Sequence, residues 1–123
     1  MNVSDIMSTD LRTAGADSTV AEAATLMGEH AVGSVIVVDA AGALLGILTE
    51  RDIVRALSST HDAPTRPVAE WMTRDPVTIS PDVEVKVALR TMVDGGFRHL
   101  PVVGENGPVG MLSIRDVAGR MAE

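Results

Sequence analysis

The sequence predicts an α/β chain, of the α+β type, built from two tandem β-α-β-β-α repeats that pack with pseudo-twofold symmetry. Three observations predict it. The chain matches itself at a shift of 65 residues, and each half alternates helical and strand-like apolar patterns. A length of 123 residues suits one ordinary domain or two small units sharing one core. We assign residues 1–57 to the first repeat, 58–67 to a linker rich in Ser, Thr and Pro, and 68–123 to the second repeat.

The internal match runs through most of each half. At the shift of 65, identical pairs include Val3 and Val68, Met7 and Met72, Thr13 and Thr78, Val20 and Val85, Met27 and Met92, and Val37 and Val102. One residue is then deleted, so Gly46, Leu48, Arg51 and Asp52 align with Gly110, Leu112, Arg115 and Asp116. A unit of roughly 55 residues is marginal by itself, so we expect the two repeats to pack sheet to sheet with clefts between them.

Each repeat begins with a short extended segment, near Thr13 or Thr78, followed by a helix. The helix is predicted by apolar residues at spacings of three and four within residues 20–27 and 85–92. One face of each helix therefore belongs to the core.

Polar residues before these helices are candidate N-caps. Asp17 and Asp82 are expected in that position, and Thr19 with Glu22 offers an alternative capping box. Either arrangement satisfies backbone amides at the start of the helix.

A β-hairpin follows the first helix in both repeats. Its strands are residues 33–38 with 43–48, and 98–103 with 108–112. These strands are apolar on both faces, so helices must cover them. A second helix then completes each repeat.

Residues 31–48 are apolar enough to suggest a membrane span, but we expect none. Asp39 near the centre would cost about 3 kcal/mol in a bilayer, and the turn-forming residues around it favour a hairpin. The repeated counterpart, residues 97–112, contains charged residues and prolines. A buried hairpin is therefore predicted in both repeats.

The composition excludes some classes of function. Ten Lys and Arg against 17 Asp and Glu leave a net charge of −7, and Phe97 and Trp71 are the only aromatic residues. Nucleic-acid binding is not expected, because phosphate neutralisation and base stacking both lack their residues. The chain has no Cys, and its first ten residues do not resemble an export signal, so we expect a cytoplasmic protein.

The strongest repeated motif lies where a strand ends and a helix begins. It reads Gly46-Ile-Leu-Thr49-Glu-Arg-Asp52 in the first repeat and Gly110-Met-Leu-Ser113-Ile-Arg-Asp116 in the second. Thr or Ser followed three residues later by Asp is a capping box, which satisfies helix-terminal amides. The same place attracts anions, its carboxylate can bind ribose hydroxyls, and the glycine would permit close ligand approach. Both roles can hold together.

With these motifs, nearly the whole chain resembles a tandem cystathionine-β-synthase (CBS) domain pair, also called a Bateman module. In that family the motif binds adenosine ligands. The resemblance implies that Asp52 and Asp116 contact the ribose, with Thr49 and Ser113 near ribose or phosphate.

The resemblance also implies an adenine pocket lined by short strands. Thr13 lies on one such strand, and Thr78 with Ile79 lies on the other. These residues would contact the base.

The segment around Arg98 resembles the family segment that faces the nucleotide phosphates. By this resemblance Arg98 and His99 reach the phosphates, while residues before Pro101, such as Leu100, pack on adenine. All four residues would belong to the ligand site. Arg98 and His99 are the only adjacent Arg-His pair in this acidic chain. Solvation of a strand end is the alternative role for them.

The first repeat lacks these cations. It has Gly33, Ser34 and Val35 at the corresponding positions, which offer hydroxyl and backbone groups but no charge. We therefore expect the second site to bind nucleotides more tightly than the first.

We interpret the chain as a non-enzymatic regulatory module that senses AMP, ADP or ATP and forms a homodimer. No cofactor is required, and His30 and His61 lack metal-ligand spacing. Catalysis is not expected, because Ser34 and Ser113 lack a partnered His in their own repeat. The alternatives are a ligand-free dimerisation or assembly module, and a binder of S-adenosylmethionine or NAD. The regulated effector protein is unknown.

Overall fold

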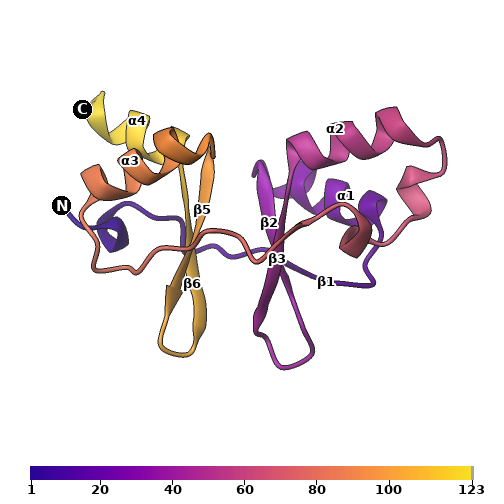
Figure 1. Cartoon of the computed structure of the whole chain (residues 1–123), viewed down its shortest axis with the longest axis horizontal. Coiled ribbons are helices and arrows are strands. Elements are labelled where there is room, and N and C mark those ends of the chain that lie inside the picture. The colour runs from indigo at the N-terminus through magenta and orange to yellow at the C-terminus, as the bar shows by residue number, and fades with distance from the viewer. Residues whose placement is uncertain (123) are drawn as a thin grey trace. The chain divides into compact units, whose positions relative to one another are not determined.

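The computed structural model describes residues 1–122 and contains four α-helices in that range (Figure 1). The elements run in the order β1 (Thr13–Gly15), α1 (Val20–His30), β2 (Ser34–Val38), β3 (Leu44–Thr49), α2 (Glu50–Ser59), β4 (Thr73–Arg74), α3 (Val85–Gly95), β5 (His99–Gly104), β6 (Gly107–Ser113) and α4 (Ile114–Met121). The mixed α/β class, both hairpins and both pairs of helices are confirmed. In the second repeat the first extended segment is reduced to a single parallel bridge between Ile79 and Val102.

The chain divides into two compact units whose limits differ from those of the sequence repeats. One unit combines Met1–Leu11 with the chain from Pro76 onward, and the other is Arg12–Asp75. The leading segment of each repeat thus joins the unit built mainly from the other repeat. The division into residues 1–57 and 68–123 describes the duplication of the sequence, whereas the compact units exchange these leading segments.

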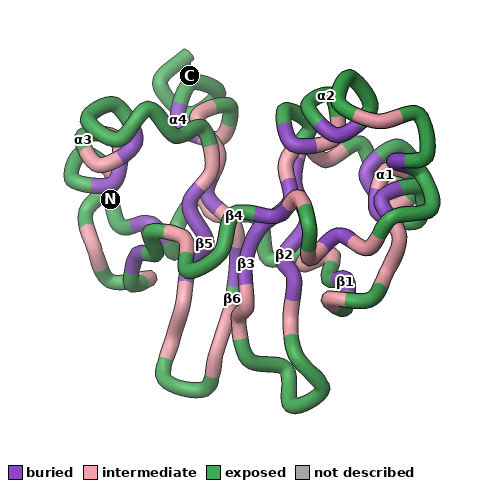
Figure 2. Tube along the Cα trace, turned by 45° about the vertical axis from the view of Figure 1, so that its right-hand side comes forward, coloured by how far each residue is buried: buried purple, intermediate pink, exposed green. Residues whose placement is uncertain are grey.

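The unit Arg12–Asp75 contains a four-stranded sheet. Its strand order is β1-β2-β3-β4, with β1 parallel to β2 and the other pairs antiparallel. α1 packs against β2, and α2 packs against β3 and α1. β2 is buried along most of its length, as expected for a strand covered on both faces (Figure 2).

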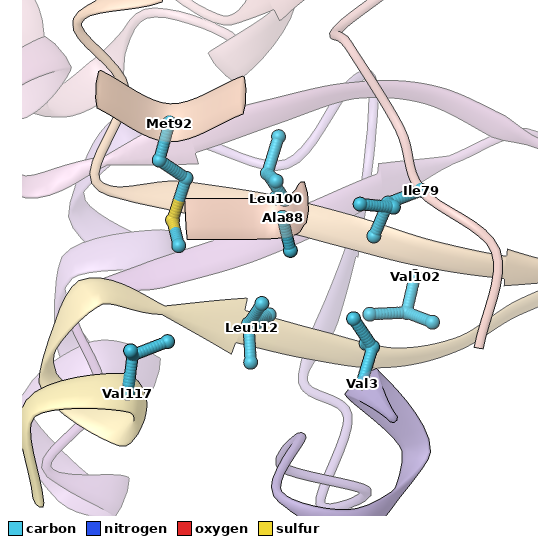
Figure 3. Close-up of a cluster of buried hydrophobic side chains, with 8 residues drawn as sticks. All are labelled: Val3, Ile79, Ala88, Met92, Leu100, Val102, Leu112 and Val117. Atoms are coloured by element: carbon cyan, nitrogen blue, oxygen red, sulfur yellow. The ribbon is translucent and has the colours of Figure 1, made fainter. Parts of the chain in front are cut away.

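The other unit is built around the β5-β6 hairpin, with α3 packed on β5 and α4 on β6. Its core consists of Val3, Ile79, Ala88, Met92, Leu100, Val102, Leu112 and Val117 (Figure 3). Figure 3 shows Val3, from the leading segment, beside Val102 of β5. The leading segment is therefore part of this core, because Val3 has no exposed surface.

The helix starts differ in part from the sequence prediction. Thr19 is the N-cap of α1 and forms the capping box with Glu22, so that alternative is confirmed. The prediction of Asp17 and Asp82 as N-caps is wrong. α3 has Glu84 in the N-cap position, without a side-chain hydrogen bond to the helix.

Backbone carbonyls from distant segments accept hydrogen bonds from the first amides of α1 and α3. The amide of Val85 donates to the carbonyl of Met1 at 3.0 Å, and the amide of Val20 donates to that of Arg66 at 2.9 Å. Each bond satisfies one of the amides that a helix start leaves without an intrahelical partner. These tertiary contacts add to the Thr19–Glu22 capping box at α1, and at α3 they act without a side-chain cap.

The Ser-, Thr- and Pro-containing linker, residues 58–67, is more ordered than its composition suggests. It contains a short 3-10 helix, Ala63–Thr65. Arg66 then forms a two-pronged ion pair with Glu70, with N···O distances of 2.8 and 2.7 Å. This hydrogen-bonded partner raises the pKa of the Arg66 guanidinium.

Candidate functional site

Each compact unit contains one set of the predicted site residues. The unit Arg12–Asp75 holds Thr13, Ser34, Val35, Thr49 and Asp52. The other unit holds Thr78, Ile79, Arg98, His99, Leu100, Pro101, Ser113 and Asp116. Two candidate sites therefore exist, each assembled within its own unit.

The first site is centred on the start of α2. The Asp52 amide donates to Thr49 Oγ1 at 3.3 Å, and the Thr49 amide donates to Asp52 Oδ2 at 2.9 Å. The Thr49 hydroxyl also donates to Oδ2, at 3.1 Å. Asp52 is only 5% exposed, so its carboxylate is a buried charge that depends on these partners.

The second site repeats this arrangement at the start of α4, with one bond fewer. The Asp116 amide donates to Ser113 Oγ at 3.0 Å, and the Ser113 amide donates to Asp116 Oδ2 at 2.9 Å. The expected capping boxes are confirmed at both helices. Each carboxylate can accept further hydrogen bonds beyond those of the cap, since each oxygen can accept about two.

Strand register brings further predicted residues to these helix starts. His99 lies directly across from Ser113 in the β5-β6 hairpin, and Ser34 lies across from Thr49 in the β2-β3 hairpin. The Arg98 carbonyl accepts the amide of Ile114, the first residue of α4, at 2.9 Å. Arg98 and His99 are therefore at the same end of the hairpin as the Ser113 cap.

The register also bears on the prediction that catalysis is not expected. It places His99 of the same repeat directly across from Ser113. The Asp116 carboxylate, however, holds the backbone amide of Ser113. In a catalytic triad the carboxylate would instead orient the imidazole.

The remaining predicted residues divide between core and surface. Val35, Ile79, Leu100 and Pro101 are buried. Thr13, Thr78 and Arg98 are exposed. The Ile79 amide donates to the Pro101 carbonyl at 3.0 Å, which aligns the segment after Thr78 beside β5.

The motif glycines have a structural role that the sequence argument missed. A Cβ at Gly46 would lie 2.5 Å from the carbonyl oxygen of Thr73, and one at Gly110 would lie 2.6 Å from Met7 Sδ and 2.9 Å from the Ser8 carbonyl oxygen. Each glycine is therefore required by the close approach of an exchanged leading segment. A backbone segment therefore occupies the space beside each glycine that was predicted to admit a ligand.

Sequence reasoning also missed Arg55 and Trp71. Arg55 Nη2 donates to Asp52 Oδ1 at 3.2 Å and to the Trp71 carbonyl at 2.9 Å. The spacing of Asp52 and Arg55, three residues apart on a predicted helix, could have indicated the ion pair. No pattern in the sequence indicates the contact between Arg55 and Trp71.

Within residues 1–122, no helix is long and apolar enough to cross a bilayer. Within the same residues, no group of three His, Cys, Asp or Glu side chains is arranged to hold a metal ion.

A hairpin leading into a capped helix, present twice, defines a duplicated α/β module. A family model described as the CBS domain matches residues 3–59 and 68–123, so this chain belongs to the CBS domain family and carries two CBS domains. An uncharacterized 17.7 kDa protein of Acidianus ambivalens is 44% identical over 117 residues, which span 94% of this chain and 70% of that protein.

Solved structures of CBS domain proteins have the same fold. The CBS-domain containing protein ATU1752 from Agrobacterium tumefaciens is 33% identical, with a TM-score of 0.92 over 98% of this chain and 99% of that chain. The CBS domain pair of protein MJ0100 is 28% identical, with a TM-score of 0.91 over 99% of this chain and 96% of that chain. That pair was solved in complex with 5′-methylthioadenosine and S-adenosyl-L-methionine.

Proposed function

We propose that this chain is a non-catalytic regulatory module that binds an adenosine nucleotide, AMP, ADP or ATP, and acts as an energy or metabolite sensor. One observation carries the proposal: Asp116 and Ser113 start α4 at the hairpin end where His99 and Arg98 also lie. Acceptors for a ribose and cations for phosphates are thus on adjacent residues of one unit.

The chemistry of this cluster suits a nucleotide. The Asp116 carboxylate can accept hydrogen bonds from both hydroxyls of a ribose, as carboxylates do in dinucleotide folds. The amides at the start of α4 carry partial positive charge, which favours an anionic ligand. Arg98 is exposed and adds a full positive charge beside them.

The adenosine-containing ligands of the MJ0100 domain pair support this class of ligand. They also keep S-adenosylmethionine as an alternative, and NAD contains the same adenosine group. A thermal-shift panel of AMP, ADP, ATP, S-adenosylmethionine, NAD and adenosine tests the proposal, because a ligand that binds only the folded state raises its stability. We expect the adenosine nucleotides to give the largest shifts. No shift with any of these compounds would favour the ligand-free assembly module.

Replacing Arg98 with Ala should remove the preference for AMP over adenosine. A charge-assisted hydrogen bond is about twice as strong as a neutral one, and adenosine has no phosphate to receive it. Calorimetry of the parent and Arg98→Ala with both ligands measures the two affinities. Equal losses for AMP and adenosine would assign Arg98 to folding, and no loss would assign it to a solvated strand end.

We also propose that the protein is a homodimer in which α2 contributes to the interface. Val54 and Leu57 are three residues apart on one face of α2 and are 65% and 52% exposed. Two neighbouring exposed apolar side chains favour association more than a single one such as Val93 on α3, because single exposed apolar residues are common on protein surfaces. Light scattering at micromolar concentration should give the mass of two chains for the parent.

A matched pair of variants tests the location of this interface. Leu57→Glu should shift the protein to a monomer, whereas Val93→Glu, on the exposed face of α3, should leave the dimer intact. A monomeric parent would contradict the dimer, and a dimeric Leu57→Glu would exclude α2 from its interface.

A further inference from the structure

The two site carboxylates have different surroundings. In the first site, Asp52 Oδ1 accepts a hydrogen bond from Arg55 Nη2 at 3.2 Å, one turn further along α2. The Asp52 side chain is 7% exposed, whereas that of Arg55 is 58% exposed. Arg55 therefore covers the carboxylate from the solvent side of the helix.

Trp71 holds Arg55 in this position. The same Nη2 atom donates to the Trp71 carbonyl at 2.9 Å, and Arg55 Cζ lies 5.9 Å from the centre of the indole ring. A guanidinium at this distance from an indole face is attracted to it. Three contacts thus fix the side chain beside Asp52.

The second site lacks both members of this arrangement. Gly119 follows Asp116 at the spacing at which Arg55 follows Asp52, and Ile6 occupies the position that corresponds to Trp71 in the repeat. Of the described residues, only Ser113 forms a hydrogen bond with the Asp116 carboxylate.

These bonds determine how many further hydrogen bonds each carboxylate can accept. An ionised carboxylate offers about four acceptor positions. Asp52 already uses three of them, for the Thr49 amide, the Thr49 hydroxyl and Arg55. Asp116 uses one, for the Ser113 amide. A ribose diol needs two acceptors, so Asp116 can bind it directly and Asp52 cannot while Arg55 is in place.

We propose that Arg55 competes with the ribose hydroxyls for Asp52 and thereby lowers the affinity of the first site for adenosine ligands. The inference rests on the proposed function. It identifies Arg55 as a residue that acts through Asp52 and sets the order in which the two sites fill, the second before the first.

Removing Arg55 should strengthen binding at the first site. The test uses calorimetry with adenosine, which has no phosphate to attract the guanidinium, in an Asp116→Ala background that disables the second site. Adding Arg55→Ala should raise the affinity about three- to tenfold, the range expected for a partly exposed charged hydrogen bond. Arg55→Lys keeps the charge and should raise it less. Arg51→Ala removes an exposed charge from the same helix and should leave it unchanged.

Placing an arginine in the second site should have the opposite effect. A Cβ at Gly119 would have no neighbour within 4 Å, so a side chain fits there. In an Asp52→Ala background, Gly119→Arg should lower adenosine affinity about threefold or more. Gly119→Ala adds the Cβ without the charge and should leave the affinity unchanged.

The fluorescence of Trp71 can report the displacement of Arg55 by adenosine, because Trp71 is the only Trp in the chain. In the Asp116→Ala protein, adenosine should displace Arg55 from the indole and change its fluorescence in step with binding. In the protein that also carries Arg55→Ala, binding should leave the fluorescence nearly constant. A purely structural role of Arg55 would not produce this difference.

The outcomes separate this inference from the proposed function. Unchanged, weaker or undetectable adenosine binding after Arg55→Ala would overturn the competition, even if the parent binds through Asp116. No binding of any adenosine compound by the parent or by the Arg55→Ala protein would overturn both.

Discussion

Replacing Gly46 or Gly110 by Ala should lower the free energy of unfolding by about 1–3 kcal/mol each. The new Cβ would lie 2.5 Å from the Thr73 carbonyl oxygen in one case and 2.6 Å from Met7 Sδ in the other. Backbone or core atoms must move to relieve these contacts. Urea denaturation of the two variants and the parent measures the loss.

Gly28→Ala is the matched control. Gly28 lies within α1, and a Cβ there would meet no atom within 4 Å. Alanine in a helix interior is favoured over glycine by about 0.5–1 kcal/mol, so this variant should be more stable than the parent. If all three substitutions changed stability in the same direction, close approach of the leading segments would not explain the two motif glycines.

Replacing Asp116 by Ala should weaken AMP binding by about 1–3 kcal/mol, through loss of the ribose hydrogen bonds. Asp52→Ala should have a smaller effect, because Arg55 already occupies that carboxylate. Calorimetry with AMP compares the two variants with the parent.

The capping role of Asp116 can be separated from ligand binding. Asp116→Asn keeps an oxygen that can accept from the Ser113 amide but loses the charge and one acceptor oxygen. It should therefore retain more stability than Asp116→Ala while still binding AMP less tightly than the parent. If Asp116→Ala and Asp52→Ala both bound AMP as well as the parent, capping would be the only role left for the motif.

Local patterns predicted the secondary structure well. The hairpin strands were expected at residues 33–38 and 43–48, and β2 and β3 occupy Ser34–Val38 and Leu44–Thr49. The capping boxes that start α2 and α4 were also predicted, because their donors and acceptors lie within three residues of one another. Such features depend on neighbours along the chain, which a sequence displays directly.

Contacts between distant segments were not predictable in this way. Asp17 and Asp82 were expected to cap helices, but neither does, and carbonyls of Arg66 and Met1 bind the first amides of α1 and α3. These partners come from segments far away in the sequence. No local pattern marks a backbone carbonyl as the partner of a distant amide.

Three features could be predicted from the sequence: the duplication, the order of elements in each repeat, and the pairing of a hydroxyl with a carboxylate at two helix starts. These follow from periodicity and short spacings, which act within a few residues. The folded chain was needed to show that Met1–Leu11 joins the unit of the second repeat, and that Arg55 reaches Trp71 while it holds Asp52. Met1–Leu11 and Trp71 meet their partners across long stretches of sequence, so no short spacing indicates these contacts. As a result, the two carboxylates of equivalent motifs can accept different numbers of hydrogen bonds from a ligand.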